Sequence, residues 1–196
     1  MNLSYGASDA FDALVYGQQH PATLSYLQSQ LSSIGNYFTD AGKSFVEKSI
    51  QRLLIDKMAM ELVLQRGLSL DSIKKNQLGW NPVQAFYRRA DWGLEEMEER
   101  QWVCLPAGIV IPIFEGKDIR KLKIRKSEWK EGDFYGKYYE VPGSSNMLPI
   151  FGSPSNEIVI IVEAEFDAML VLQEAGDLCA CIVLGGAQKR PPHSLH

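Results

Sequence analysis

The chain has 196 residues, of which 45% are hydrophobic and 22% charged, as in ordinary globular proteins. This length supports one or two domains with a hydrophobic core and excludes collagen-like, coiled-coil or wholly disordered architecture. The net charge of −4 does not by itself indicate a nucleic-acid-binding protein. The longest apolar run, Cys179 to Leu184, is too short for a membrane span of about 20 residues. No signal peptide is visible, and we expect a soluble, cytoplasmic protein without a membrane partner.

Cysteine and histidine are too few and too scattered for a zinc site. The three cysteines are Cys104, Cys179 and Cys181, and none belongs to a Cys-x-x-Cys pair. Structural zinc needs four ligands, usually in close pairs. We therefore expect no zinc, and free thiols in a reducing compartment.

The first third of the chain has a helical pattern. Residues 1–66 are expected to be helical, and Gly67 is the predicted end of the last turn. Ser69 is a predicted cap for a short helix from Leu70 to Asn76. From Ser44 onward, apolar residues at helical spacing predict one continuous apolar stripe along a helix, formed by Val46, Ile50, Leu53, Leu54, Met58 and Leu62. The acidic residues 91–100 predict a solvated helix face rather than a metal site.

The pattern changes from helix to strand after Pro106. Residues 109–114 are apolar and predict a strand, in which Pro112 indicates an edge position or a bulge. A turn at 115–118 leads to a second strand at 119–126. Its alternation places Leu122 and Ile124 on one face and Lys121, Lys123 and Arg125 on the other.

Local charge departs from the average around this second strand. Residues 117–137 contain eight Lys or Arg against four Asp or Glu, with aromatic residues between them. Basic groups beside stacking surfaces suit single-stranded nucleic acid. An ordinary solvated edge strand explains the lysines equally well, because edge lysines block aggregation.

The last segment predicts a strand, a helix and a second strand. Residues 158–162 are an apolar run typical of a strand covered on both faces. A helix from Phe166 to Ala175 and a strand from Cys179 to Leu184 follow, closed by a turn at 185–187. Glu163 follows the first strand and Asp167 lies one helical turn later, so the two carboxylates are candidate Mg²⁺ ligands.

These segments resemble, in order, the core of bacterial and phage DNA primases. Residues 158–168, Ile-Val-Ile-Ile-Val-Glu-Ala-Glu-Phe-Asp-Ala, are similar to the opening motif of a TOPRIM domain. Upstream, Arg-Gly-Leu-Ser at 66–69 and Leu-Gly-Trp at 78–80 resemble the primase lead-in. Residues 108–113 resemble the first core strand, and 137–144 resemble a basic family loop. The resemblance covers about residues 58–190.

The resemblance implies template-directed synthesis of RNA primers on single-stranded DNA by Mg²⁺-dependent (or Mn²⁺-dependent) nucleotidyl transfer in DNA replication. It assigns the metal-binding and catalytic role to Glu163, with Asp167 beside it. It assigns the grip on template or nucleotide phosphate to Arg125 and Lys137, which join Lys121 and Lys123 as candidate phosphate ligands. Nucleotides, template and a replicative helicase are the implied partners.

Three departures from the family pattern limit this expectation. Ala164 stands where the motif has glycine, whose backbone freedom opens the metal site. The family's Asp-x-Asp motif is not reached before His196, and no zinc module precedes the core. We therefore expect an incomplete, inactive primase-like fragment with weak or absent metal binding. We also expect an exposed apolar edge beside 158–162 or 179–184, and hence association.

The expected fold class is α+β: a helical N-terminal region, a small mixed or antiparallel β subdomain, and the first strand–helix–strand of a TOPRIM sheet. The expected segments are a helical extension at 1–57, a helical lead-in at 58–105, a basic β subdomain at 106–152 and a partial TOPRIM domain at 153–196. Two alternatives remain open. One is a non-catalytic single-strand-binding or replication accessory module, and the other is a phage or mobile-element protein whose N-terminus binds a partner.

Overall fold

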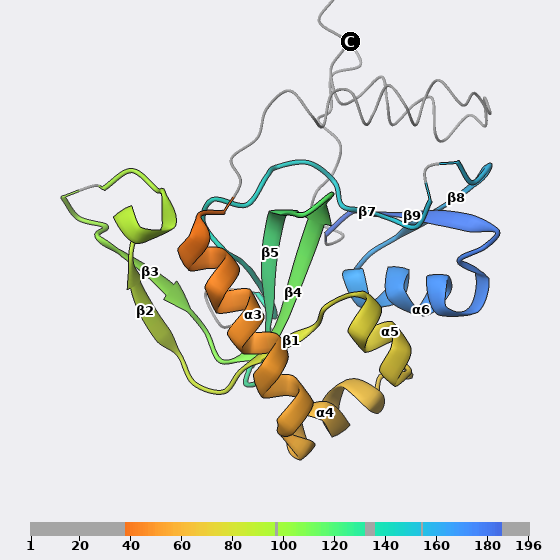
Figure 1. Ribbon diagram of the computed structural model, residues 1–196, viewed down its shortest axis with the longest axis horizontal. Coiled ribbons are helices and arrows are strands. Elements are labelled where there is room, and N and C mark those ends of the chain that lie inside the picture. The colour runs from red at the N-terminus through yellow and green to blue at the C-terminus, as the bar shows by residue number, and fades with distance from the viewer. Residues whose placement is uncertain (1–37, 97, 132–135, 154, 186–196) are drawn as a thin grey trace, which may run out of the picture. The chain divides into compact units, whose positions relative to one another are not determined.

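The computed structural model describes residues 38–96, 98–131, 136–153 and 155–185 (Figure 1). They form two compact units, one within Gly35–Asn146 and the other from Met147 onward. Helices come first, then antiparallel sheets, and finally a strand–helix–strand with a parallel pair, which confirms the predicted α+β class. The predictions for residues 1–37, for the aromatic residues at 134 and 135, and for the turn residues 186 and 187 lie outside the described residues. The four predicted segments stay a prediction.

Two helices replace the single stripe predicted from Ser44 onward. α3 spans Asp40–Ile55 and α4 spans Lys57–Leu64. They are separate because the backbone of Asp56 is extended and its carboxylate accepts a hydrogen bond from Ala59 N at 3.0 Å, capping α4. The break turns Met58 and Leu62 to the surface, so the prediction of one continuous stripe is wrong.

The short helix α5 (Leu70–Lys75) confirms the next prediction. The Ser69 hydroxyl accepts a hydrogen bond from Ser72 N at 3.1 Å, and Gly67 has a φ of 89°, the left-handed conformation expected of a glycine that ends a helix. The acidic segment at 91–100 does not form the helix that was predicted for it. Among the described residues of this segment, only those of the 3₁₀ turn η1 (Ala90–Trp92) are helical, and the glutamates that follow are exposed.

A four-stranded antiparallel sheet forms the centre of the first unit. It consists of β1 (Gly79–Asn81), β4 (Gly108–Glu115), β5 (Asp118–Lys126) and β6 (Tyr138–Glu140), in the order β1-β4-β5-β6. β5 pairs on both sides, so its interpretation as an edge strand is wrong. Pro112 lies on the part of β4 beyond its pairing with β1, and the register shifts between Ile113 and Phe114. Both observations agree with the predicted edge or bulge.

α3 packs on one face of this sheet (Figure 1). At Gly79 the approach is so close that a Cβ atom would lie 2.6 Å from Ser49 Cβ. Glycine is therefore required where β1 passes under the helix. The core on this face contains Phe45, Val46, Val110, Leu122 and Ile124, so the predicted inward direction of Leu122 and Ile124 is confirmed.

A separate hairpin pairs β2 (Ala85–Arg88) with β3 (Trp102–Leu105). Tyr87, Val103 and Leu105 pack into the same core as α3, and Tyr87 contacts Phe45 and Trp92 in tilted or edge-on ring pairs. The hairpin is thus held on the core of the first unit by one face, and Phe86 and Trp102 lie on its other face.

The second unit contains β7 (Ile150–Phe151), β8 (Ile158–Val162), α6 (Glu165–Ala175) and β9 (Cys179–Val183). The sheet order is β7-β9-β8, and β8 and β9 are parallel, as predicted. β9 is buried throughout, but Ile158 and Ile161 of β8 are exposed. Coverage of β8 on both faces was therefore a wrong expectation, and the exposed side chains agree with the expected apolar edge. No helix among the described residues is long and apolar enough to cross a bilayer.

Candidate functional site

A row of four side chains crosses the sheet on the face opposite α3. Trp80 of β1 pairs with Ile109 of β4, Ile109 with Arg125 of β5, and Arg125 with Tyr138 of β6. Directly paired residues in neighbouring strands point to the same side of a sheet, so these side chains lie side by side. The alternation around Gly79, which faces α3, places this row on the other face.

The end of α4 closes this row into a cleft of about 230 Å³. Arg66 follows α4 and brings a second guanidinium group to the cleft that Arg125 lines. The lining residues are Leu62, Gln65, Arg66, Trp80, Ile109, Arg125 and Ser127, and none of them is acidic. Arg125 Nε and Trp80 Nε1 are buried and have no hydrogen-bond partner among the described residues. Two N–H donors of the cleft residues are therefore unpaired within the described part of the chain.

Lys137 interacts electrostatically with Arg66 and Arg125. Burial, and then the charge of Arg66, lowers the pKa of Arg125, against an opposing interaction with Tyr138. The charge of Arg125 is the main cause that lowers the pKa of Lys137, followed by burial and by Arg66. The charge of Arg66 thus disfavours the charged form of Arg125, and both arginines disfavour the charged form of Lys137. An anion placed among the three would relieve this repulsion.

The other predicted basic residues have different surroundings. Lys121 and Lys123 share the face of Arg125, as predicted, but only 4% and 5% of their surfaces are exposed. Lys121 Nζ lies 3.1 Å from Glu140 Oε2 in an ion pair. Arg120, the residue before Lys121 in β5, forms an ion pair with Glu115 at 2.6 Å. Lys121 is thus paired within the sheet and Lys123 is buried, and neither lines the cleft that Arg66 and Arg125 line.

The candidate carboxylates lie at the end of β8. Glu163 follows the strand directly and its side chain is exposed. Asp167 Oδ2 accepts a hydrogen bond from Ala164 N at 3.2 Å, so it caps the first turn of α6. Ala164 has φ −130° and ψ 161°, an extended conformation that any residue adopts. Alanine in place of the motif's glycine therefore causes no backbone strain here.

A divalent cation finds only part of a site in these residues. Their hard carboxylate oxygens suit Mg²⁺, which retains water and takes further ligands from phosphates. No group of three or more His, Cys, Asp or Glu within the described ranges is arranged to hold a metal ion. Glu163 and Asp167 are thus compatible with Mg²⁺ as contributing ligands, and they do not form a closed metal cage by themselves.

Arg66 and Trp80 belong to the cleft but were not among the predicted site residues. Both occur in the quoted lead-in motifs, so the motif position itself was the available signal. Sequence spacing does not relate residue 66 to residue 125. The two guanidinium groups line one cleft only when α4, β1, β4 and β5 have packed together.

Comparisons with known proteins support the fold. No family model matches the sequence, and no curated protein matches it. Among solved structures, the zinc-binding and RNA polymerase domains of Aquifex aeolicus primase are 19% identical, with a TM-score of 0.52 over 93% of this chain and 52% of that one.

Two further matches are complexes with DNA. The RNA polymerase domain of Mycobacterium tuberculosis primase DnaG, bound to a DNA duplex with a 6-nucleotide overhang, is 12% identical, with a TM-score of 0.53 over 72% of this chain and 52% of that one. A DnaG primase catalytic domain bound to ssDNA is 14% identical, with a TM-score of 0.51 over 71% and 53%. This chain spans about half of each solved chain and shares its fold, which confirms the predicted resemblance at that level.

Proposed function

We propose that this chain is the template-binding part of a primase-like enzyme and that its basic cleft holds a phosphate of single-stranded DNA. The observation that carries the proposal is that Arg66 and Arg125 line one cleft and that Lys137 lies close enough for both to lower its pKa. Structures with the same fold have been solved with DNA bound.

The chemistry of the cleft favours a phosphate over other anions. Guanidinium groups donate paired hydrogen bonds that match the oxygens of a phosphate, and Lys137 adds a mobile point charge. Contacts of this kind position a strand without selecting its sequence. Trp80 and Tyr138 flank the cations and offer aromatic surface to an adjoining base.

Primer synthesis is the proposed activity of the whole enzyme. Glu163 and Asp167 would contribute ligands to Mg²⁺, which when bound activates a hydroxyl nucleophile and neutralises a leaving pyrophosphate. Glu163 is the better candidate, because it is exposed and Asp167 is already bonded to the first turn of α6. Lys121 and Lys123 are proposed as secondary phosphate contacts, with Lys121 released from Glu140 for that purpose.

Fluorescence anisotropy with a labelled oligothymidine tests the binding. We expect salt-sensitive binding by the wild-type chain and a loss of affinity of about tenfold or more when Arg66 and Arg125 are both replaced by Gln. Equal affinity in the double variant would refute the assignment of the cleft. Extension of a template by nucleotides in Mg²⁺ or Mn²⁺ tests the catalytic part separately.

A second candidate function is strand binding without catalysis. It is favoured by one observation, that the described carboxylates supply fewer than three grouped metal ligands. Under this alternative, Glu163→Gln leaves every activity of the chain unchanged, whereas Arg125→Ala still weakens DNA binding.

A further inference from the structure

The outer face of the β2–β3 hairpin exposes two aromatic side chains. Phe86 is 58% exposed and Trp102 is 54% exposed, although Val103 and Leu105 on the hairpin's inner face are buried in the core. Antiparallel sheets that face water on one side normally place polar residues there. Large exposed aromatic side chains grouped on one rigid face are typical of an interaction surface.

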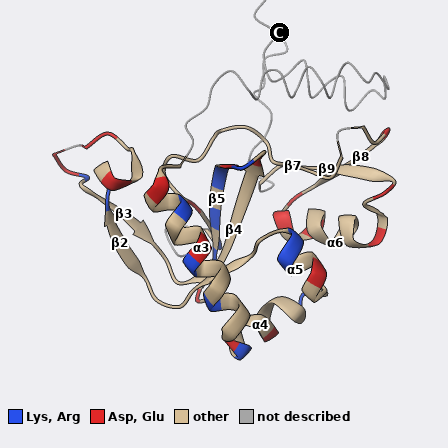
Figure 2. Cartoon of the chain, viewed as in Figure 1, with Lys and Arg blue, Asp and Glu red and all other residues tan. Residues whose placement is uncertain are grey.

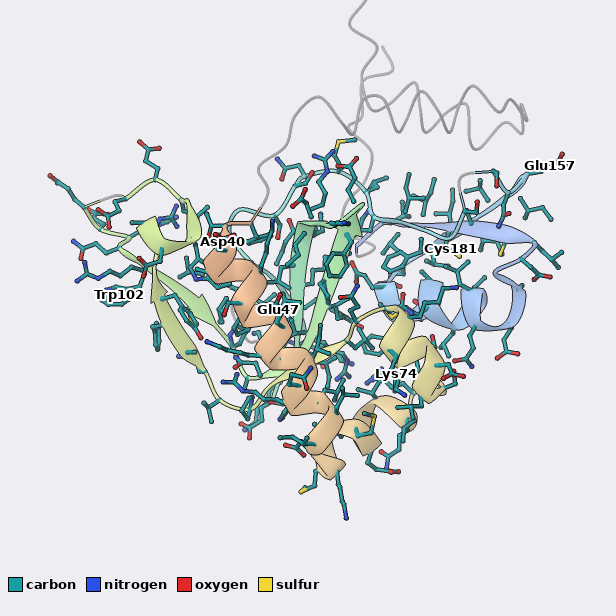
Figure 3. All side chains as sticks on the ribbon, in the orientation of Figure 1. Asp40, Glu47, Lys74, Trp102, Glu157 and Cys181 are labelled. Atoms are coloured by element: carbon teal, nitrogen blue, oxygen red, sulfur yellow. The ribbon has the colours of Figure 1, made fainter. Side chains whose placement is uncertain are left out.

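The register brings these side chains together on one face. Phe86 lies opposite Cys104, and Arg88 lies opposite Trp102. The Arg88 guanidinium stacks on the Trp102 ring, 5.8 Å from its centroid, and Figure 3 shows Trp102 extending outward from the hairpin. Tyr87 and Val103, which alternate with them, hold the strands on the core. The aromatic face is therefore presented in a fixed orientation.

An acidic segment borders this face. Residues 95–99 contribute four exposed glutamates, Glu95, Glu96, Glu98 and Glu99. Arg89 Nε donates a hydrogen bond to the Glu95 carbonyl at 2.8 Å, and Arg89 N donates to the Gln101 carbonyl at 2.9 Å. These bonds hold the acidic segment at the end of the hairpin, and Figure 2 shows its acidic residues between η1 and β3.

The charge decides which class of partner fits. Residues 85–105 carry three Arg against five Asp or Glu, so the phosphates of a nucleic acid or of an anionic lipid are repelled. Aromatic anchors surrounded by a polar rim are typical of a protein interface, and the acidic rim here is complementary to Lys or Arg. The geometry points to a docking site for a protein segment that presents an apolar side chain flanked by Lys or Arg. This inference is independent of the basic cleft and of its proposed function.

Peptide selection on the whole chain tests this inference. Peptides from a random displayed library are selected for binding, and the affinity of the strongest is measured. We expect Lys or Arg beside an aromatic or aliphatic residue in the selected peptides. Phe86→Ser and Trp102→Ser together should weaken binding about tenfold or more. Replacing Glu95, Glu96 and Glu98 by Gln should weaken it less and reduce its salt dependence.

A matched control uses other exposed apolar residues. Ile55→Ser and Met58→Ser together remove side chains that are 80% and 82% exposed and do not lie on the hairpin, and we expect unchanged peptide affinity. The inference is overturned if no peptide is selected, if the selected peptides are acidic, or if they bind the Phe86 and Trp102 variant as tightly as the wild type. Displacement of the peptide by oligothymidine in the Arg66 and Arg125 double variant would also overturn it, and would assign the face to nucleic acid.

Discussion

The basic cleft and the carboxylate end of β8 are the two candidate sites, and they are built differently. The cleft is assembled from residues on β1, β4, β5 and the end of α4, and its two arginines lower the pKa of the nearby Lys137. The carboxylates come from one short segment after β8, where Glu163 is exposed and Asp167 caps α6. A site held by sheet packing is fixed before its ligand arrives. A site at a strand end depends on further ligands, here those of the metal and the substrate.

The largest expected effect concerns the cleft itself. Arg125→Ala should weaken oligothymidine binding about tenfold to a hundredfold, because it removes a charge-assisted contact of roughly 1.5–3 kcal/mol. Lys48→Ala is the matched control, since it removes one exposed cation of α3 that lies outside the cleft. Fluorescence anisotropy measures both variants, and similar losses in the two would mean that only net charge matters.

The next prediction concerns the packing that supports the cleft. Gly79→Ala places a Cβ atom 2.6 Å from Ser49 Cβ and 2.8 Å from its backbone carbon. We expect the free energy of unfolding to fall by about 1–3 kcal/mol, with weaker DNA binding because Trp80 follows directly. Gly136→Ala is the control, since its Cβ would meet nothing within 4 Å. Denaturant titration that finds equal stability in both variants would contradict the close approach of α3.

A third prediction separates the two carboxylates. Asp167→Ala should lower the free energy of unfolding by about 1 kcal/mol, because the Ala164 amide loses its acceptor. Glu163→Gln should leave stability unchanged, since its side chain is exposed, and should weaken Mg²⁺ binding measured by isothermal calorimetry. The opposite pattern would exchange the roles assigned to the two residues.

The smallest effect is a change of pKa. Arg125 lowers the pKa of Lys137, so Arg125→Gln should raise it, as measured by NMR titration of the Lys137 side chain. Lys137 binds phosphate only when protonated, so its contribution to affinity is lost as pH rises through its pKa. In the wild type this loss occurs below the pH at which an ordinary lysine deprotonates, near 10.4. An unchanged Lys137 pKa in the variant would show that the two cations are not neighbours.

Local patterns predicted the elements better than the surroundings of their side chains. The alternation in β5 correctly placed Leu122 inward and Arg125 on the other face, because strand period is a local property. The helix break at Asp56 was missed, since an aspartate inside an apolar stripe indicates a cap only when the chain turns there. The burial of Lys121 and Lys123 was missed as well, because strand alternation does not show what covers a face; Glu140, the ion-pair partner of Lys121, lies 19 residues along the chain.

The parallel pairing of β8 and β9 was predictable from a local sequence pattern, whereas the burial of β8 was not. An apolar run, a helix and a second apolar run are the pattern that suggests a parallel crossover. Whether β8 is covered depends on its neighbours in the sheet, and the exposure of Ile158 and Ile161 is a property of that arrangement.

The salt dependence of DNA binding is the most direct test of the basic cleft. Single-strand affinity falls with salt in proportion to the number of phosphates neutralised. We predict that replacing Arg66, Arg125 and Lys137 by Gln makes the slope of log affinity against log salt less steep by about 2. A slope equal to that of the wild type would contradict the claim that these three cations hold the strand.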